Sequence, residues 1–193
     1  MQYPAEPWHM QGSLVISLFR VPRKLVPDAH LPSTARLITL AGNALVAVAF
    51  VSYEPGSELT YEELLVATPV LDEGRVAVSV PQIWVDSEAS RDGGREMWGI
   101  PKKLARFGEG SSIAAVAVAG GVRLPGRWTA AGWTAQRLDG RDVRTRMRMS
   151  GRVSVARSAW LFPAGGPLGY LTGRTPLVSF TMKDMRLTFG QDR

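Results

Sequence analysis

Cysteine is absent from the 193 residues of the chain. Disulfides, zinc–thiolate sites and thiol nucleophiles are therefore excluded. Histidine occurs only as His9 and His30, which lie in unlike contexts without ligand spacing, so the sequence predicts no metal site. The chain also lacks a G-x-S-x-G nucleophile elbow, a Walker loop and a G-x-G-x-x-G turn after a strand. We therefore expect no metal ion and no cofactor.

Long apolar runs are missing as well. The longest, residues 44–51, is too short to cross a bilayer. The first twelve residues, MQYPAEPWHMQG, contain no basic region followed by an apolar run, so they do not resemble a signal peptide. The 45% hydrophobic and 21% charged residues are typical of an ordinary globular protein. We expect one cytoplasmic domain, residues 1–193, without a membrane partner.

The net charge of +6 is unevenly distributed along the chain. Residues 1–97 hold 7 basic and 12 acidic side chains, whereas residues 98–193 hold 16 basic and 5 acidic ones. Such an asymmetry is compatible with a nucleic-acid surface, with attraction of small anionic substrates, or with acidic and basic faces that meet in an oligomer.

Three arginines in the basic half are the best argument for nucleic-acid binding. Arg144, Arg146 and Arg148 alternate with other residues, which places all three on one face of a strand. No aromatic motif of the kind found in RNA-binding sheets accompanies them. We therefore favour a polar outer face of a half-buried strand and do not expect nucleic acid as a partner.

Short β-forming segments separated by turns dominate the chain. The predicted strands are residues 13–19, 43–53, 61–70, 75–85, 112–119, 121–124, 128–137, 143–154 and 177–189. Residues 86–98 are the best helix candidate, with Asp86 or Ser87 as its cap. This pattern predicts a mainly β fold, a large antiparallel sheet or barrel with few and short helices.

Several positions carry finer expectations. Pro81 indicates an edge or a bulge in its strand, because proline cannot donate to a sheet ladder. Gly93 and Gly94 are expected to interrupt the helix. The pair Gly120–Gly121 is expected to form a turn between two strands, and LDGRD, residues 138–142, is a hairpin signal.

The stretch GGREMWGIPKKLARF, residues 93–107, places Lys102 and Lys103 among bulky apolar residues. A lysine held in apolar surroundings beside a second cation loses its proton more readily and becomes an amine nucleophile. Taken alone, the pair is better explained by a solvated turn after Pro101. Neighbours in a strand point to opposite faces, so one of the two is expected to enter a cavity, and the alternation does not say which.

The run GREMWGIPKKLA closely resembles the G-R-E-x-x-G-[FY]-P-K-K-L-[AG] signature of the acetoacetate decarboxylase family. Upstream, YEE at residues 61–63 and ATPV at residues 67–70 resemble the family's Y-x-E segment and the strand that follows it. WHMQG at residues 8–12, before a strand ending in FRVP, resembles the family's N-terminal segment. These matches frame residues 8–107, whereas the second half of the chain matches only as a series of strands.

The resemblance implies a cone-like antiparallel β-barrel whose cavity holds a lysine that forms a Schiff base with a ketone. Acetoacetate decarboxylase is a recognised example of a lysine activated by desolvation and a neighbouring cation. By motif position, Lys102 matches the Schiff-base lysine, Lys103 the neighbour that lowers its pKa, and Glu63 the glutamate that orients or protonates the intermediate. The resemblance further suggests substrate contacts from Gln11, Tyr61 and Trp98, and supporting roles for Arg95 and Glu96.

One position departs from the family pattern. Gln11 stands where decarboxylases carry an active-site arginine, and glutamine cannot pair as a cation with a carboxylate. An arginine from the strand of Arg144, Arg146 and Arg148 would substitute for it if that face pointed inward.

Three functions follow from the resemblance and from this departure. The first is a Schiff-base decarboxylase that acts on a β-keto acid. The second is a Schiff-base aldolase-dehydratase or cyclase that acts on a larger keto acid, which the glutamine favours. The third is a barrel without enzymatic activity that binds a ligand, which the joint presence of Lys102, Lys103 and Glu63 disfavours. The partner expected is a small-molecule keto acid, and the family implies a homo-oligomer.

Overall fold

Strands fill most of the computed structural model, which describes residues 3–27, 30–108 and 113–191. Its elements, with η marking short 3-10 helices, are β1 (Trp8–Pro22), η1 (Arg23–Leu25), β2 (Ala35–Leu37), β3 (Thr39–Leu40), β4 (Asn43–Tyr53), β5 (Tyr61–Asp72), β6 (Arg75–Val85), α1 (Glu88–Trp98), β7 (Lys102–Leu104), β8 (Ala115–Arg123), β9 (Trp128–Leu138), β10 (Arg141–Leu161), η2 (Gly169–Leu171) and β11 (Val178–Phe189). The mainly β fold with few helices is confirmed.

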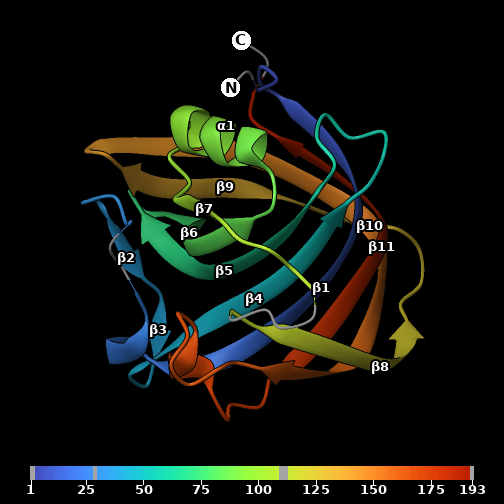
Figure 1. Cartoon of the computed structure of the whole chain (residues 1–193). Helices are drawn as coiled ribbons and strands as arrows, with labels where there is room; N and C mark the ends of the chain where they lie inside the picture. The colour runs from blue at the N-terminus through green and yellow to red at the C-terminus, as the bar shows by residue number, and fades with distance from the viewer. Residues whose placement is uncertain (1–2, 28–29, 109–112, 192–193) are drawn as a thin grey trace.

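Seven of the strands close into a ring (Figure 1). Its order is β1, β11, β10, β9, β6, β5 and β4, and β4 pairs with β1 again. Most neighbours are antiparallel, as predicted, but β6 pairs in parallel with β9 at a single position, Val78 with Thr134. This sparse junction is supplemented by Gln136 of β9, whose amide binds the backbone N–H and C=O of Val80 in β6.

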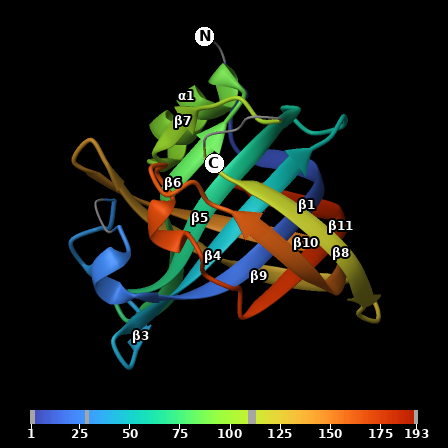
Figure 2. The ribbon, with the colours of Figure 1, turned by 60° about the horizontal axis from the view of Figure 1, so that its bottom comes forward.

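Both faces of the sheet are buried around β4, which explains the apolar run in its sequence. Ala47, Ala49 and Val51 face the inside of the ring, whereas Val46 and Val48 pack into a second core on its outside. The segment that contains η2 covers this outer core through Phe162, Leu168 and Leu171. In Figure 2, β8 crosses the outside of the ring, where it pairs with β10.

The sequence underestimated how long the strands of the ring are. β1 starts at Trp8 and β10 extends to Leu161, so each is considerably longer than its predicted segment. The expected turn at Gly120–Gly121 is wrong: β8 runs through both glycines, and its register with β10 shifts there, between Val155 and Arg157. The start of that predicted strand, Ser112, lies outside the described residues.

Other local expectations are confirmed. The register between β5 and β6 shifts opposite Val66 and Thr68, which places a bulge at Pro81 of β6. Asp139 and Gly140 form the turn between β9 and β10. In the described part of the chain, no helix has the length and apolar character needed to cross a membrane.

Candidate active site

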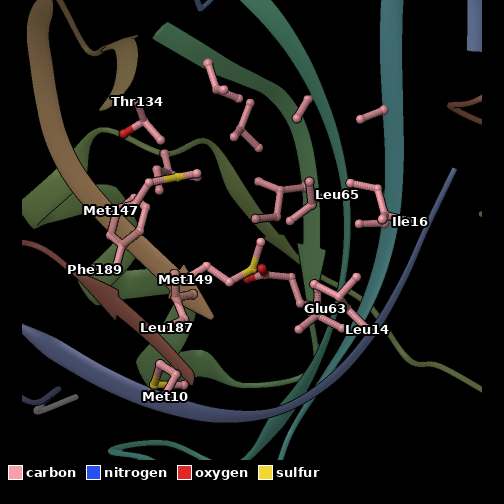
Figure 3. A pocket seen from close by; sticks show the side chains of 18 of the residues that line it. Met10, Leu14, Ile16, Glu63, Leu65, Thr134, Met147, Met149, Leu187 and Phe189 are labelled. Atoms are coloured by element: carbon pink, nitrogen blue, oxygen red, sulfur yellow. The ribbon is translucent and has the colours of Figure 1, made fainter. Parts of the chain in front are cut away.

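The seven-strand ring encloses a cavity of about 360 Å³. Aliphatic, aromatic and methionine side chains make up most of its wall, as Figure 3 shows for Met10, Leu65 and Met149. Among the 28 described residues that line it, only Glu63 and Lys102 carry a charge. The cavity is therefore an apolar chamber with one charged pair.

Lys102 reaches the cavity because β7 extends the edge of β6. The two strands pair in parallel, with Lys102 beside Ile83 and Lys103 beside Trp84. Ile83 lines the cavity, whereas Trp84 belongs to the outer core. Strand alternation therefore directs Lys102 inward, where it is 4% exposed, and leaves Lys103 exposed on the opposite face.

The side chain of Lys102 ends in a compact polar cluster. Its Nζ donates hydrogen bonds to Glu63 Oε2 at 2.9 Å, to Ser90 Oγ at 2.9 Å and to the Tyr61 hydroxyl at 3.2 Å. Tyr61 and Tyr53 in turn donate to the Glu63 carboxylate at 3.3 and 3.4 Å. Hydrogen bonds of this kind are what allow two opposite charges to be buried together.

Helix α1 forms one wall of this polar cluster and lies across one end of the ring (Figure 1). Its N-cap is Ser87, as the sequence suggested, and the Ser87 hydroxyl accepts a hydrogen bond from the backbone N–H of Ser90. Gly99 ends the helix in the left-handed conformation, with φ at 62°. The cap and the end together fix which face of α1 turns toward the cavity.

The two glycines of α1 do not interrupt the helix but let it approach the site closely. A methyl group at Gly94 would lie 2.7 Å from Cδ of Lys102, and one at Gly93 would lie 2.8 Å from Cζ2 of Trp8. With Ser90, they occupy the inward face of α1 at helical spacing. The helix backbone therefore packs directly against the lysine side chain and the indole.

Aromatic rings surround the lysine at this end of the cavity. Trp8 and Trp98 meet edge to face with centroids 4.7 Å apart, and Trp98 meets Phe189 in the same way at 4.7 Å. Nζ of Lys102 lies 5.2 Å from the centroid of the Tyr61 ring and 6.0 Å from that of Trp8. Cation–π contacts thus supplement the hydrogen bonds of the buried amine.

Tyr53 and Tyr61 act as hydrogen-bond donors and not as bases. Burial raises the pKa of both phenols well above its usual value, and the negative charge of Glu63 raises it further. Both hydroxyls therefore keep their protons at neutral pH.

The raised pKa values predict an alkaline limit to stability. A phenol with a higher pKa in the folded state stabilises the fold fully below about pH 10, its unfolded value, and this contribution is lost as the pH rises further. We expect Tyr53 and Tyr61 to ionise only as the protein unfolds, measured as phenolate absorbance during an alkaline titration. Tyr53→Phe and Tyr61→Phe should each remove one late-ionising phenol, and an unchanged late step would contradict the assignment.

Comparison with known proteins places this site in a family. The family model for acetoacetate decarboxylase (ADC) matches residues 4–150, three quarters of the chain. The chain belongs to the acetoacetate decarboxylase family. The match includes Glu63, Lys102 and the strands that hold them. A search of curated proteins gave no match.

Solved structures share the fold at low sequence identity. Acetoacetate decarboxylase from Legionella pneumophila is 19% identical, with a TM-score of 0.71 over 98% of this chain and 87% of that one. An acetoacetate decarboxylase-like enzyme from Sphingomonas wittichii RW1 is 14% identical, with a TM-score of 0.55 over 97% of this chain and 92% of the other. MppR, an enduracididine biosynthesis enzyme, is 16% identical, with a TM-score of 0.54 over 100% and 90% of the two chains.

In this member of the acetoacetate decarboxylase family, two of the residues expected to take part in catalysis or substrate binding, Lys103 and Gln11, do not line the cavity. Lys103 faces outward, as described above. Gln11 is exposed on the outer face of β1, and its side-chain amide donates to the backbone oxygen of Pro55 in the loop between β4 and β5. Its neighbours Met10 and Gly12 are the buried residues here, so strand alternation turns Gln11 away from a substrate in the cavity.

The arginines of β10 do not enter the cavity either. Arg144 pairs with Asp72 and Glu73, Arg146 lies over the ring of Trp133, and Arg148 is exposed. They share one face, as predicted, and it is the polar outer face that the sequence favoured. The intervening methionines of β10 line the cavity instead. No arginine therefore replaces the missing family arginine among the described lining residues.

The remaining expected residues are divided between the cavity and the outer side of α1. Tyr61 and Trp98 line the cavity. Arg95 lies 3.7 Å from the carboxylate of Asp139, and Glu96 accepts a hydrogen bond from Tyr3, which raises the pKa of that phenol. Arg95 and Glu96 thus tie α1 to the surrounding chain without lining the cavity.

Two residues of the polar cluster, Ser90 and Tyr53, were not predicted from the sequence. Ser90 precedes Gly94 by one helical turn, so three small residues on the inward helix face were the available signal for a close approach. Tyr53 stands opposite Tyr61 across the paired strands β4 and β5. Tyr53 is the last residue of β4, and the next strand, β5, begins with the Y-x-E segment at Tyr61. This hairpin arrangement was the available signal for a second phenol beside Glu63.

Proposed function

We propose that Lys102 forms an imine with the carbonyl group of a keto acid and that the protein decarboxylates a β-keto acid through this intermediate. One observation supports this proposal. Lys102 is the only amine among the described residues that line the cavity, and it is buried beside the carboxylate of Glu63. An amine in an apolar chamber, with Glu63 at 2.9 Å to exchange its protons, has the arrangement that covalent catalysis by lysine requires.

The proposed reaction begins with attack of Nζ on the carbonyl carbon. The carbonyl oxygen receives two protons, one that Nζ loses and one from the protonated Glu63, and leaves as water, so the new C–N bond becomes that of an iminium. The bond between the α-carbon and the carboxylate then breaks: its electron pair moves toward the iminium nitrogen, and CO₂ leaves. Protonation of the enamine carbon and addition of water to the iminium release the ketone and restore the lysine.

Glu63 is the group placed to move these protons. Its Oε2 contacts Nζ directly, so it can accept the proton that Nζ must lose and return one to the departing oxygen or to the enamine carbon. Tyr53 and Tyr61 hold the carboxylate from one side, and Ser90 holds the amine from another. These contacts fix the direction in which the amine can attack.

An aldol-type reaction is the second candidate, and the charge of the cavity favours it. The carboxylate of a β-keto acid substrate would lie next to the imine. Among the described residues that line the cavity, no cation other than Lys102 itself could pair with it. Cleavage or condensation of a C–C bond through the same enamine needs no carboxylate at that position. MppR, which shares the fold, has been captured with the condensation product of pyruvate and imidazole 4-carboxaldehyde.

Borohydride trapping tests the proposal. The protein is incubated with β-keto acids, α-keto acids and aldehydes, reduced, and mapped by peptide mass spectrometry, with CO₂ release followed in parallel. We expect a reduced adduct on Lys102, and the exposed residues Lys103 and Lys183 are internal controls for non-specific reaction. An adduct with CO₂ release identifies the decarboxylase, and an adduct without it identifies aldol chemistry. The absence of any adduct on Lys102 across the panel would refute both.

The influence of Lys103 on the reactivity of Lys102 stays a prediction, and we expect this influence to be small. Because its ammonium faces solvent, its influence on Lys102 is screened, and an exposed charge contributes at most about 1 kcal/mol. We expect Lys103→Ala to raise the pH at which imine formation is half-maximal by less than about one unit. The measurement is the rate of borohydride trapping against pH. A larger upward shift would show that the neighbouring cation dominates.

A further inference from the structure

The cavity is larger than a small keto acid requires. Its 360 Å³ would accommodate on the order of a dozen water-sized groups. A short substrate bound at Lys102 would leave much of this apolar wall without contacts, which forfeits the dispersion and hydrophobic energy of binding. The volume therefore fits a carbonyl compound that carries a long substituent.

The wall beyond the charged pair fits an apolar and flexible chain. Four methionines, Met10, Met147, Met149 and Met185, line the cavity. Methionine side chains are unbranched and polarisable, so they adapt to ligands of varying shape. A second charge on the ligand would be buried without a partner, because the cavity's two charged groups already bind each other.

One polar group remains unused in the wall. Thr134 lines the cavity, is 2% exposed, and has a side-chain hydroxyl without a hydrogen-bond partner. The hydroxyl of Thr68 also lacks a partner, but Thr68 alternates with Val66 and Val70 of the outer core on the opposite face of the sheet. A buried hydroxyl without a partner is costly, and most native proteins avoid it. The hydroxyls around Lys102 differ in this respect, since Ser90, Tyr53 and Tyr61 are all engaged.

The unused hydroxyl lies far from the amine. Thr134 pairs with Val78 of β6, and Val78 pairs with Pro69 of β5. Pro69 follows Glu63 by six residues, a separation of about 20 Å along an extended strand. Figure 3 shows Thr134 on the opposite side of the pocket from Glu63.

We propose that the cavity binds an elongated carbonyl compound in one orientation. Its carbonyl carbon lies at Lys102, an uncharged alkyl chain fills the space beside the methionines, and an uncharged hydroxyl or carbonyl group on the far part of the chain binds Thr134. The placement of the carbonyl rests on the proposed imine chemistry, whereas the preference for the chain and its far polar group follows from the wall of the cavity alone.

Ketones of increasing length test the chain. Methyl ketones from 2-butanone to 2-tridecanone are trapped on the full-length protein with borohydride, and the concentration for half-maximal adduct on Lys102 is measured. We expect this concentration to fall by about fourfold for each added methylene until the cavity is full. A half-maximal concentration that does not depend on chain length would overturn the proposal.

Hydroxylated ketones test the far polar group. Each long ketone is compared with its counterpart that carries a terminal hydroxyl, in the wild type and in Thr134→Val, which keeps the side-chain shape. We expect this variant to weaken trapping of the hydroxylated ketone about fivefold relative to the plain one. Thr134→Ser, which keeps the hydroxyl, should behave as wild type, and so should Thr129→Val, an exposed position on the same strand as Thr134. Equal effects on both ketones would show that water alone serves this threonine and would overturn the proposed subsite.

A binding assay separates failure of the chemistry from failure of this inference. Trp8 and Trp98 line the cavity, so their fluorescence reports ligands that cannot form an imine, such as primary alcohols and terminal diols of matched length. If no ketone is trapped on Lys102 but these ligands bind with the same dependence on length and on the Thr134 hydroxyl, the proposed function fails and the subsite stands. If trapping succeeds and neither dependence is found, the function stands and the subsite fails.

Discussion

Lys102→Arg should abolish imine formation and reduce turnover by on the order of 10⁴-fold or more, the usual loss when a covalent nucleophile is removed. Arginine keeps a positive charge beside Glu63, so the buried pair is retained. Its guanidinium stays protonated at any accessible pH and cannot add to a carbonyl. The measurement is the yield of borohydride adduct together with the rate of product formation, compared with wild type under the same conditions.

The space around the lysine requires a second variant. A methyl group at Gly94 would already be too close to the lysine side chain, so the larger guanidinium must be shown to fit. Lys102→Met combined with Glu63→Gln is uncharged and close in size to the native pair, and it should be equally inactive. Circular dichroism and cooperative unfolding establish that both proteins are folded. Retained adduct formation in either would show that another amine performs the chemistry.

The lysine pair shows what strand alternation could and could not predict. The sequence predicted that only one of Lys102 and Lys103 enters the cavity, and this is how β7 is built. It could not tell which, because the choice depends on the register of β7 against β6, a contact set by residues about twenty positions upstream. The same limit applied to the arginines of β10: their common face was predictable from local spacing, but its direction was not.

Glycine was the residue type most often misjudged. Gly93 and Gly94 were expected to break the helix, since glycine weakens helices in isolation. In the structure the missing side chains make room for Trp8 and Lys102, so packing outweighs propensity. Gly120 and Gly121 were expected to form a turn, but they lie in a bulge held by pairing with β10. In both cases the deciding contact comes from a residue distant in sequence, which a local pattern does not contain.

The outer core was the other feature that local sequence patterns did not predict. The apolar run in β4 was correctly assigned to a strand. The chain that covers the second face comes from residues 160–171, more than a hundred positions later. Residues 163–169 are rich in glycine and proline, and nothing in this composition indicates that Leu168 and Leu171 are fully buried.

The buried pair of Lys102 and Glu63 should also dominate the stability of the site. Each side chain is 5% exposed, so removal of one partner leaves the other charge buried. We expect Lys102→Met and Glu63→Gln each to lower the free energy of unfolding by about 3–5 kcal/mol, the cost of breaking a buried pair. The measurement is denaturant unfolding at neutral pH, with the slope of the transition compared to exclude a change in the unfolded state.

The double variant Lys102→Met/Glu63→Gln distinguishes a charge effect from a packing effect. If an uncompensated charge causes the loss, removal of both charges should restore most of it, to within about 1–2 kcal/mol of wild type. The amide of the glutamine still offers an oxygen to Tyr53 and Tyr61, so their hydrogen bonds are retained. Additive losses would instead show that each side chain contributes through its own packing. Recovery of stability with complete loss of imine formation would mean that the pair is kept for its chemistry, because the fold alone does not require it.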